Sequence, residues 1–263
     1  SSIRPPLYRM VPLGGIVSNN SGGVVSLTPP GGDCIAAQEY KKMITNMFNS
    51  CLIMKKKTEN VFCVLRPPGH HALNTGKDEG FCFYNHIAIA AKYLKIKYKK
   101  KKILIVDWDY HHGNSTEHFF YKDPSVLFFS THDANAYPRT GFPNRKGEGK
   151  GKGFNVNVHL PCGTKDKTII SVFKDILEKK ADDFKPDFIL ISAGFDSRKN
   201  DTLGCFEITD NGFKELTKIV MNIASKYCNE KILSILEGGY NVKGNAKAVV
   251  THIETLNNFN KKV

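Results

Sequence analysis

The sequence contains no apolar run long enough to cross a membrane. Its longest runs, at 103–106 and 188–193, have the length of a strand, whereas a membrane-spanning helix needs roughly 20 residues. Glycine and proline number only 22 and 12 among 263 residues, too few for a fibrous or disordered chain. The chain starts at Ser1 without a methionine or an apolar signal region, which is typical of a fragment that has lost its targeting information. We therefore expect no membrane partner.

The sequence also lacks a Cys-x-x-Cys pair. Its seven cysteines are an odd number and fall mostly inside apolar patterns, where cysteine behaves as a small buried hydrophobe. We expect a reduced, intracellular protein, located in the nucleus, the cytoplasm or both.

Negative charge is scarce, because 25 Asp and Glu oppose 38 Lys and Arg and leave a net charge of +13. A positive field favours anionic partners. Much of the excess lies in two lysine runs, at 55–57 and 92–102, which join helix patterns to strand patterns. No aromatic-studded basic stripe accompanies them. We interpret these lysines as solvated and expect no direct sequence-specific binding of nucleic acid.

Six apolar runs without polar alternation predict parallel strands that are covered on both faces; they are 61–65, 103–106, 126–129, 154–159, 188–193 and 232–236. Apolar residues at spacings of three and four predict helices at 40–48, 87–94, 170–177 and 213–223. Strands that alternate with helices favour a doubly wound α/β sheet in one domain. Segments 1–32 and 138–153 are rich in glycine and are expected to be irregular.

Polar or glycine-rich segments follow five of the predicted strands: 66–71, 107–114, 130–133, 194–196 and 237–240. In open parallel sheets the ligand crevice lies outside the carboxyl ends of the strands. These segments are therefore expected to meet in one pocket, although they are far apart in sequence. This convergence predicts an active site.

The segment after the second of these strands has the spacing Asp-x-Asp-x-His. Side chains at 107, 109 and 111 share one side of an extended backbone, so Asp109 and His111 are expected to hold one metal ion together. A third ligand, Asp196, would leave one position open for water, as catalytic zinc sites do. A single Asp after a strand is more often a cap, and the prediction depends on the three residues together.

Two further motifs fit such a centre. His70 and His71 follow a rigid Pro-Pro-Gly turn, and imidazoles beside an activated water suit general acid and base catalysis. Gly238 and Gly239 allow close approach of backbone to a ligand, and they place the Tyr240 hydroxyl where it can donate to a developing oxyanion. The alternatives are two surface histidines in a loop and a packing tyrosine at a helix entry.

Six co-ordered motifs, at 66–72, 80–85, 107–114, 137–141, 192–196 and 236–241, resemble the zinc-dependent histone deacetylase family, and the details are closer to its class II branch. The resemblance runs from about residue 30 to the end. It implies an arginase-like three-layer α/β fold, with a central, mostly parallel sheet and helices on both faces. The chain would be a single catalytic domain, 1–263, without the family's usual amino-terminal segment.

The resemblance also implies roles for individual residues. Zinc would be bound by Asp109, His111 and Asp196, and a companion potassium ion by Asp107 and Ser130 among others. The catalytic groups would be His71 as base and then acid, His70 as its electrostatic partner, Asp107 and Asn114 as their respective supports, and Tyr240 as donor to the acetyl oxygen. Substrate contacts would come from Phe81 and Tyr137 as tunnel walls, Leu203 at the mouth, Gly80 as an acceptor, and Gly239.

The expected activity is hydrolysis of acetyl-lysine in histone tails or other proteins, and the expected partners include a repressor complex. Two alternatives stay open: an amidohydrolase for acetylpolyamines or other small acetylamides, and a catalytically weak scaffold that binds acetyl-lysine. Leu203 argues against the polyamine enzyme, which has an acidic gatekeeper there. An arginase-type enzyme would need ligands for two manganese ions, and this sequence supplies too few.

Overall fold

The structure is a computed structural model and describes residues 17–19, 22–26, 60–75, 77 and 79–258. The strands are β1 (Val17–Asn19), β2 (Gly22–Ser26), β3 (Asn60–Val64), β4 (Ile103–Asp107), β5 (Val126–His132), β6 (Asn155–His159), β7 (Phe188–Ala193) and β8 (Ile232–Leu236). The helices are α2 (His86–Tyr98), α3 (Asn114–Phe120), α4 (Asp166–Val172), α5 (Glu178–Phe184), α6 (Asp210–Tyr227) and α7 (Val242–Asn258), with a 3-10 turn η2 (Gly149–Gly151) and a π-helical turn η3 (Phe173–Leu177).

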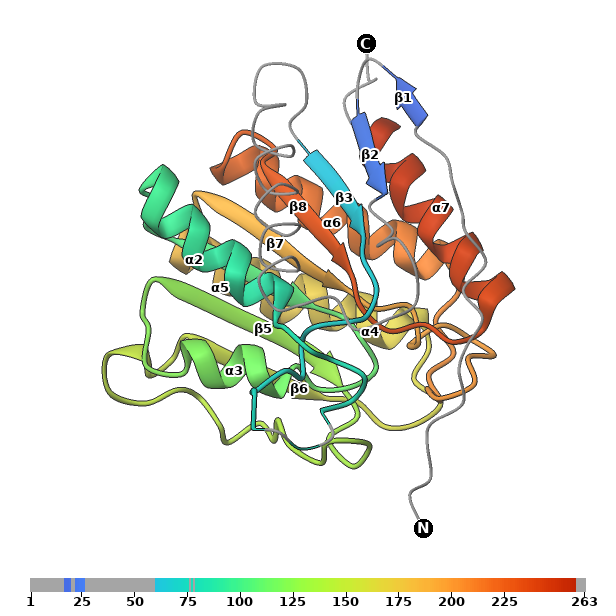
Figure 1. The fold of residues 1–263 in the computed structure, drawn as a ribbon, viewed down its shortest axis with the longest axis horizontal. Helices are drawn as coiled ribbons and strands as arrows, with labels where there is room; N and C mark the ends of the chain where they lie inside the picture. Colours follow the sequence, from blue (N-terminus) through green and yellow to red (C-terminus); the bar gives the residue numbers. More distant parts are fainter. Residues whose placement is uncertain (1–16, 20–21, 27–59, 76, 78, 259–263) are drawn as a thin grey trace.

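The strands form one sheet in the order β1-β2-β3-β8-β7-β4-β5-β6 (Figure 1). Every neighbouring pair is parallel except β1 and β2. All six predicted strands are present, and β4, β5, β7 and β8 are buried along their whole length. A sheet covered on both faces needs apolar residues on both sides of each strand. This requirement explains the continuous apolar runs and confirms a mostly parallel sheet.

Alternate residues of each strand pack into two separate cores. In β4, Ile103 and Ile105 join the core formed with α2, whereas Leu104 and Val106 join the core formed with α4 to α7. Helices α2 and α3 therefore cover one face of the sheet, and α4, η3, α5, α6 and α7 cover the other (Figure 1). The result is the three-layer α/β architecture that the sequence predicts.

The helix predictions are confirmed where the apolar stripe is strong. Segment 87–94 lies in α2, 213–223 lies in α6, and 170–177 runs through α4 and η3. Helix 40–48 lies outside the described residues. The sequence analysis missed α3, α5 and α7. Helix α7 is buried partly through polar groups: His252 lies 2.8 Å from Thr217 Oγ1 and 2.9 Å from Ser234 Oγ, so its inner face does not read as an apolar stripe.

Two expectations about the chain need correction. Segment 1–32 is not irregular throughout, because β1 and β2 form within it; their valines favour strands despite the surrounding glycine. The cysteines are not all reduced, because Cys162 and Cys205 form a disulfide. The hydrogen bond from Gly163 N to Cys205 O, 2.8 Å long, brings these two loops together.

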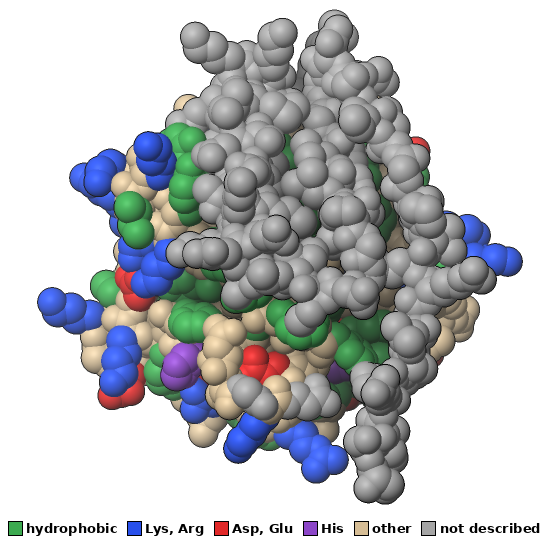
Figure 2. All heavy atoms as spheres, viewed as in Figure 1, with side chains coloured by type: hydrophobic (Ala, Val, Ile, Leu, Met, Phe, Trp, Pro, Cys, Tyr) green, Lys and Arg blue, Asp and Glu red, His purple; other side chains and the backbone are tan. Residues whose placement is uncertain are grey.

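The lysine run at 92–102 is solvated, as predicted. Lys92, Lys97, Lys99, Lys101 and Lys102 are exposed, and Figure 2 shows Lys and Arg side chains projecting at the margins of the face that it presents. Among the helices that the structure describes, none combines the length and the apolar character needed to cross a membrane.

Candidate active site

The polar segments singled out in the sequence meet at the carboxyl ends of the central strands. Asp107, the last residue of β4, pairs in register with Ser130 of β5 and with Ser192 of β7. Ala193 of β7 pairs with Leu236 of β8. The loops that leave these strands therefore begin side by side, as a parallel sheet requires.

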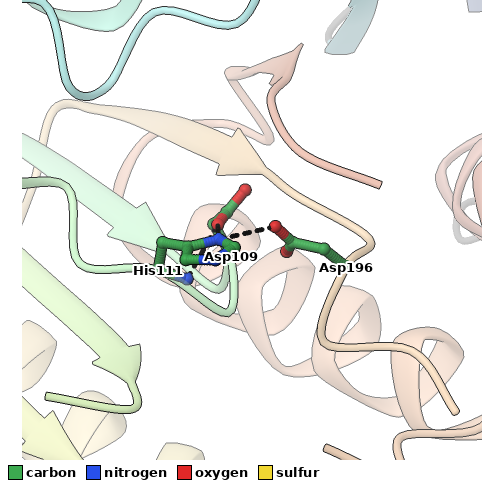
Figure 3. Close-up of side chains that lie close together, drawn as sticks. All are labelled: Asp109, His111 and Asp196. Atoms are coloured by element: carbon green, nitrogen blue, oxygen red, sulfur yellow. Dashed lines mark hydrogen bonds and ion pairs between the residues drawn. The ribbon is translucent and has the colours of Figure 1, made fainter. Parts of the chain in front are cut away.

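Asp109, His111 and Asp196 form the centre of this site (Figure 3). Each offers one ligand atom, and the three atoms lie within 4.8 Å of one another. His111 Nδ1 lies 2.9 Å from Asp196 Oδ2 and 3.2 Å from Asp109 Oδ1. Both carboxylates are fully buried. Two carboxylates and one imidazole suit a zinc ion that keeps an open position.

The backbone from Asp107 to His111 does not have the extended conformation that the sequence analysis predicted. Strand β4 ends at Asp107, so the extended backbone invoked for residues 107 to 111 is wrong. Instead, Asp107 Oδ1 accepts from Asp109 N at 3.2 Å, and Asp109 Oδ1 accepts from His111 N at 2.8 Å. These side-chain-to-backbone bonds across two residues are typical of aspartate turns. They curl the chain so that Asp109 and His111 still face one point.

The surroundings of the three residues fit a bound cation. Burial and the charge of Asp109 raise the pKa of Asp196 to about 6. Burial acts in the opposite direction on His111, but Asp196 and Asp109 raise its pKa to about 10. Buried carboxylates this close together need a positive partner. At Gly238 an added Cβ would collide with the Oδ2 atoms of Asp196 and Asp109, so glycine keeps the space beside these oxygens open.

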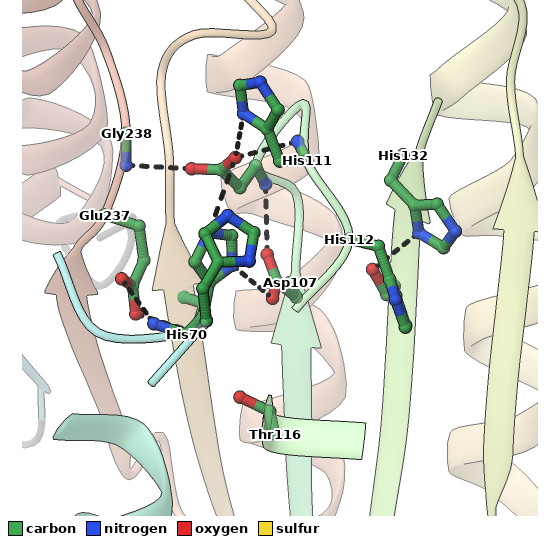
Figure 4. Close-up of polar contacts among 12 residues, drawn as sticks. His70, Asp107, His111, His112, Thr116, His132, Glu237 and Gly238 are labelled. Carbon is green, nitrogen blue, oxygen red and sulfur yellow. Dashed lines mark hydrogen bonds and ion pairs between the residues drawn. The ribbon is translucent and has the colours of Figure 1, made fainter. Parts of the chain in front are cut away.

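His70 and His71 lie next to this centre with their ring centroids 4.0 Å apart. His70 Nδ1 lies 3.0 Å from Asp107 Oδ2, and His71 Nδ1 lies 2.8 Å from Asn114 Oδ1 (Figure 4 shows the His70 contact). Both histidines are at most 4% exposed, so the alternative of two surface histidines is wrong.

The two histidines have opposite electrostatic surroundings. Burial alone would lower the pKa of His70, but the negative charges of Asp109, Asp107 and Glu237 raise it well above its usual value. Burial and the neighbouring His70 lower the pKa of His71 well below its usual value. The surroundings therefore favour the charged form of His70 and the neutral form of His71. A neutral imidazole is the form that accepts a proton.

The sequence analysis missed two residues that fix the histidine turn. Glu237 is fully buried, and its Oε2 accepts from Gly69 N at 2.7 Å and from His70 N at 3.2 Å (Figure 4). Arg66 donates to the carbonyls of Glu237 and Gly239 at 2.8 and 3.0 Å. A glutamate directly after an apolar strand was the available signal, because a buried carboxylate there must find donors.

Tyr240 and the predicted substrate contacts lie around the same centre. The Phe81 and Tyr240 rings are 5.9 Å apart, and the His71 and Tyr137 rings are 5.0 Å apart. Burial raises the pKa of the Tyr240 hydroxyl, which keeps it protonated as a donor. Phe81 is 61% exposed and Leu203 is 52% exposed, and their role as substrate contacts stays a prediction.

Glycines 80 and 239 have special backbone positions. Gly80 has φ +59°, and a Cβ there would collide with the rings of His71 and Tyr137; Gly80 therefore lies against His71. Gly239 has φ +131°, a conformation that disfavours any other residue. Its carbonyl accepts from Arg66 and from Asn245 Nδ2, each at 3.0 Å. Both glycines thus permit the turns that surround Tyr240 and His71.

The residues expected to bind potassium lie on the neighbouring strands β4 and β5. Asp107 and Ser130 are register partners on neighbouring strands, and both are fully buried. Ser130 Oγ lies 2.8 Å from His132 Nδ1. Asp107 thus lies between the histidine turn and β5.

An Asp, His and Asp cluster with a backed histidine pair, at the carboxyl edge of a parallel sheet, is an arrangement that can hold a metal ion with one position left open. The chain matches the histone deacetylase domain over residues 36–256, and it belongs to the histone deacetylase family. It is 43% identical over 192 residues to a probable deacetylase of Archaeoglobus fulgidus, covering 73% of this chain and 53% of that one. It is 40% identical over 208 residues to histone deacetylase 15 of Arabidopsis thaliana, covering 78% and 37%.

A solved structure supports the same fold. The crystal structure of the HDA15 HD domain superposes with a TM-score of 0.72 at 37% identity, covering 82% of this chain and 60% of that one. The arginase-like α/β fold implied by the sequence resemblance is thereby confirmed. The chain spans about half or less of the length of the curated relatives named above.

Proposed function

We propose that this protein is a zinc-dependent lysine deacetylase, which hydrolyses the acetyl amide of acetyl-lysine in histone tails or other proteins. The observation that carries the proposal is the arrangement of the candidate metal ligands beside two histidines, one backed by a carboxylate and one by an amide. Tyr240 completes the set expected of an amide hydrolase in this family.

Asp109, His111 and Asp196 would hold the zinc ion, which when bound supplies Lewis-acid activation of water and of the scissile carbonyl. His71 accepts the proton of the attacking water, because Asn114 Oδ1 accepts from Nδ1 and leaves Nε2 free of hydrogen. His71 then returns that proton to the departing lysine amine. His70, charged beside Asp107, stabilises the negative charge that develops on the carbonyl oxygen. Tyr240 donates a hydrogen bond to the same oxygen.

The side chains at the entrance support an uncharged substrate. Phe81, Tyr137 and Leu203 present apolar surface, which suits the methylene stem of a lysine whose charge is masked by acetylation. Membership in a repressor complex, a nuclear or cytoplasmic location and a potassium ion at Asp107 and Ser130 belong to the same proposal. Two relatives, from rice and Arabidopsis, are named as chloroplastic.

The proposal is tested by acetate release from an acetyl-lysine peptide with zinc-loaded protein. Tyr240→Phe is the matched control, because it removes only the hydroxyl. Turnover by the wild type that falls strongly in this variant supports the proposal. Turnover only with a trifluoroacetyl peptide, whose carbonyl is more electrophilic, would contradict efficient deacetylation and favour the acetyl-lysine-binding scaffold.

A further inference from the structure

The carboxylate of Asp201 joins two loops that are about 40 residues apart in the sequence. Its Oδ1 accepts hydrogen bonds from Leu203 N at 2.9 Å and Gly204 N at 3.2 Å. Its Oδ2 accepts from Tyr240 N at 2.7 Å and Asn241 N at 3.0 Å. Hydrogen bonds from backbone N–H groups to a carboxylate are about twice as strong as neutral ones. One side chain therefore satisfies four backbone donors, two on each loop.

These two loops carry different parts of the proposed site. One presents Leu203 at the entrance, and its Gly204 packs against the backbone of the metal ligand Asp196. The other carries Tyr240, whose ring contacts Phe81. A second bond, from Asn241 Nδ2 to Asn200 O at 2.8 Å, runs parallel to the carboxylate bridge. The loops are thus joined at the level of the entrance, directly beside the oxyanion donor.

We infer that Asp201 is a positioning residue, which fixes the Tyr240 hydroxyl relative to the entrance loop and the metal ligands. The inference rests on the proposed function for its kinetic consequence. Asp201 acts through Tyr240, because its carboxylate bonds to the backbone of residues 240 and 241. Displacing a catalytic group by about 1 Å can cost about 100-fold in rate. The carboxylate is therefore expected to matter for turnover more than for substrate binding.

Asp201→Asn is the informative variant, because it keeps the size of the side chain. Its amide group replaces one oxygen with a donor, so two backbone N–H groups lose their acceptor. We expect kcat for an acetyl-lysine peptide to fall about 10- to 100-fold, with KM changed by less than about threefold. With a trifluoroacetyl peptide kcat should fall by a smaller factor, because hydrolysis of this more electrophilic substrate depends less on the oxyanion donor.

Asp123→Asn is the matched control. Asp123 also accepts from a backbone N–H, that of Ser125 at 3.0 Å, and it pairs with Lys95, but it precedes β5, at the amino end of the strands. Its substitution should leave kcat within about twofold of the wild type, because the proposed site lies at the carboxyl end of the strands. Bound zinc should be unchanged in both variants. If Asp123→Asn lowers kcat as much as Asp201→Asn does, the effect is general destabilisation and the inference is overturned.

A double-mutant cycle tests the route through Tyr240. In a Tyr240→Phe background, Asp201→Asn should lower kcat by less than about threefold, because the hydroxyl that Asp201 positions is already absent. Equal losses in both backgrounds would overturn the inference. A wild type that turns over together with an equally active Asp201→Asn variant would leave the proposed function intact and reject only the positioning role.

Hydrogen exchange gives a readout that does not depend on turnover. In Asp201→Asn, the amides of at least one of the two loops, 203–204 or 240–241, should exchange faster, because only one acceptor oxygen remains, whereas those of β4 stay protected. Unchanged exchange in both loops would overturn the inference even if the wild type releases no acetate. Absence of turnover in the zinc-loaded wild type would by itself count against the proposed function, not against the link between the loops.

Discussion

The Nδ1 atom of His71 lies 2.8 Å from the Oδ1 atom of Asn114, so this histidine is supported by an amide. His70, its neighbour, is supported by the carboxylate of Asp107 at 3.0 Å. An amide oxygen fixes the orientation of an imidazole without adding negative charge. The two rings are therefore prepared for different tasks, although they are adjacent in the sequence.

The first prediction concerns this contact. Asn114→Ala removes the acceptor for His71 Nδ1, and we expect kcat/KM to fall about 10- to 100-fold, as is usual when a supporting group behind a catalytic imidazole is lost. Asn114→Asp keeps an acceptor for His71 Nδ1, so kcat/KM should fall by a smaller factor in this variant. Steady-state kinetics with an acetyl-lysine peptide will measure both, with zinc content as a control. Equal losses in the two variants would show that the acceptor is not what matters.

A second prediction concerns the space beside the metal ligands. Gly238→Ala places a Cβ against the carboxylates of Asp109 and Asp196, and we expect substoichiometric zinc after loading and dialysis. Gly244→Ala is the control, because there the nearest atom belongs to the flexible Arg198 side chain. Atomic absorption on folded protein gives the stoichiometry. Full zinc binding by Gly238→Ala would mean that the ligand set lies elsewhere.

A third prediction concerns the acid stability of the fold. Glu117 of α3 is 3% exposed, and its carboxylate accepts from Arg145 Nε at 2.6 Å and from the side-chain amides of Asn155 and Asn157 at 2.8 and 2.6 Å. Burial would raise its pKa, but His112, Asn157 and Arg145 lower it to about 2. The cluster joins α3, β6 and the loop 138–153.

Because the folded pKa of Glu117 is depressed, its stabilisation is present above the unfolded value near 4.5 and is lost as the pH falls toward 2. Glu117→Gln should lower the free energy of unfolding by about 3 kcal/mol at neutral pH, with the difference shrinking below the unfolded value. Urea titrations at pH 7 and pH 3.5 will measure it. Glu148→Gln, which breaks a surface pair with Lys122, should change stability by less than about 1 kcal/mol. A pH-independent deficit in Glu117→Gln would refute this account.

A fourth prediction separates the two candidate substrates. Leu203, which the proposed function places at the entrance, is 52% exposed and offers no charge to a cationic acetylpolyamine. Leu203→Glu should raise kcat/KM for acetylspermidine relative to an acetyl-lysine peptide by about fivefold, the value of one partly exposed ion pair near 1 kcal/mol. Leu203→Gln controls for size and polarity. A wild type that already prefers acetylspermidine would support the polyamine alternative.

The strand pattern was predictable because burial on both faces leaves a simple trace in the sequence. All six predicted strands begin and end within three residues of their predicted limits, and the polar segments after them meet at one edge. Helix α7 was not predictable in the same way, because its buried face includes His252 and Thr255. Polar groups that are satisfied only by distant partners, such as Thr217 and Ser234, look like surface residues in the sequence.

By itself, the sequence determined the six central strands, the residue types at their ends, and the three residues whose ligand atoms lie together. Local patterns suffice for these, because a strand buried on both faces is a continuous apolar run and parallel strands end at a common edge. Only the tertiary structure decided which carboxylates support the site from a distance. Glu237 bonds to the backbone at Gly69, 168 residues away, and Asp201 bonds to the backbone at Tyr240. A hydrogen bond between remote segments depends on how the chain packs, and no local pattern records it.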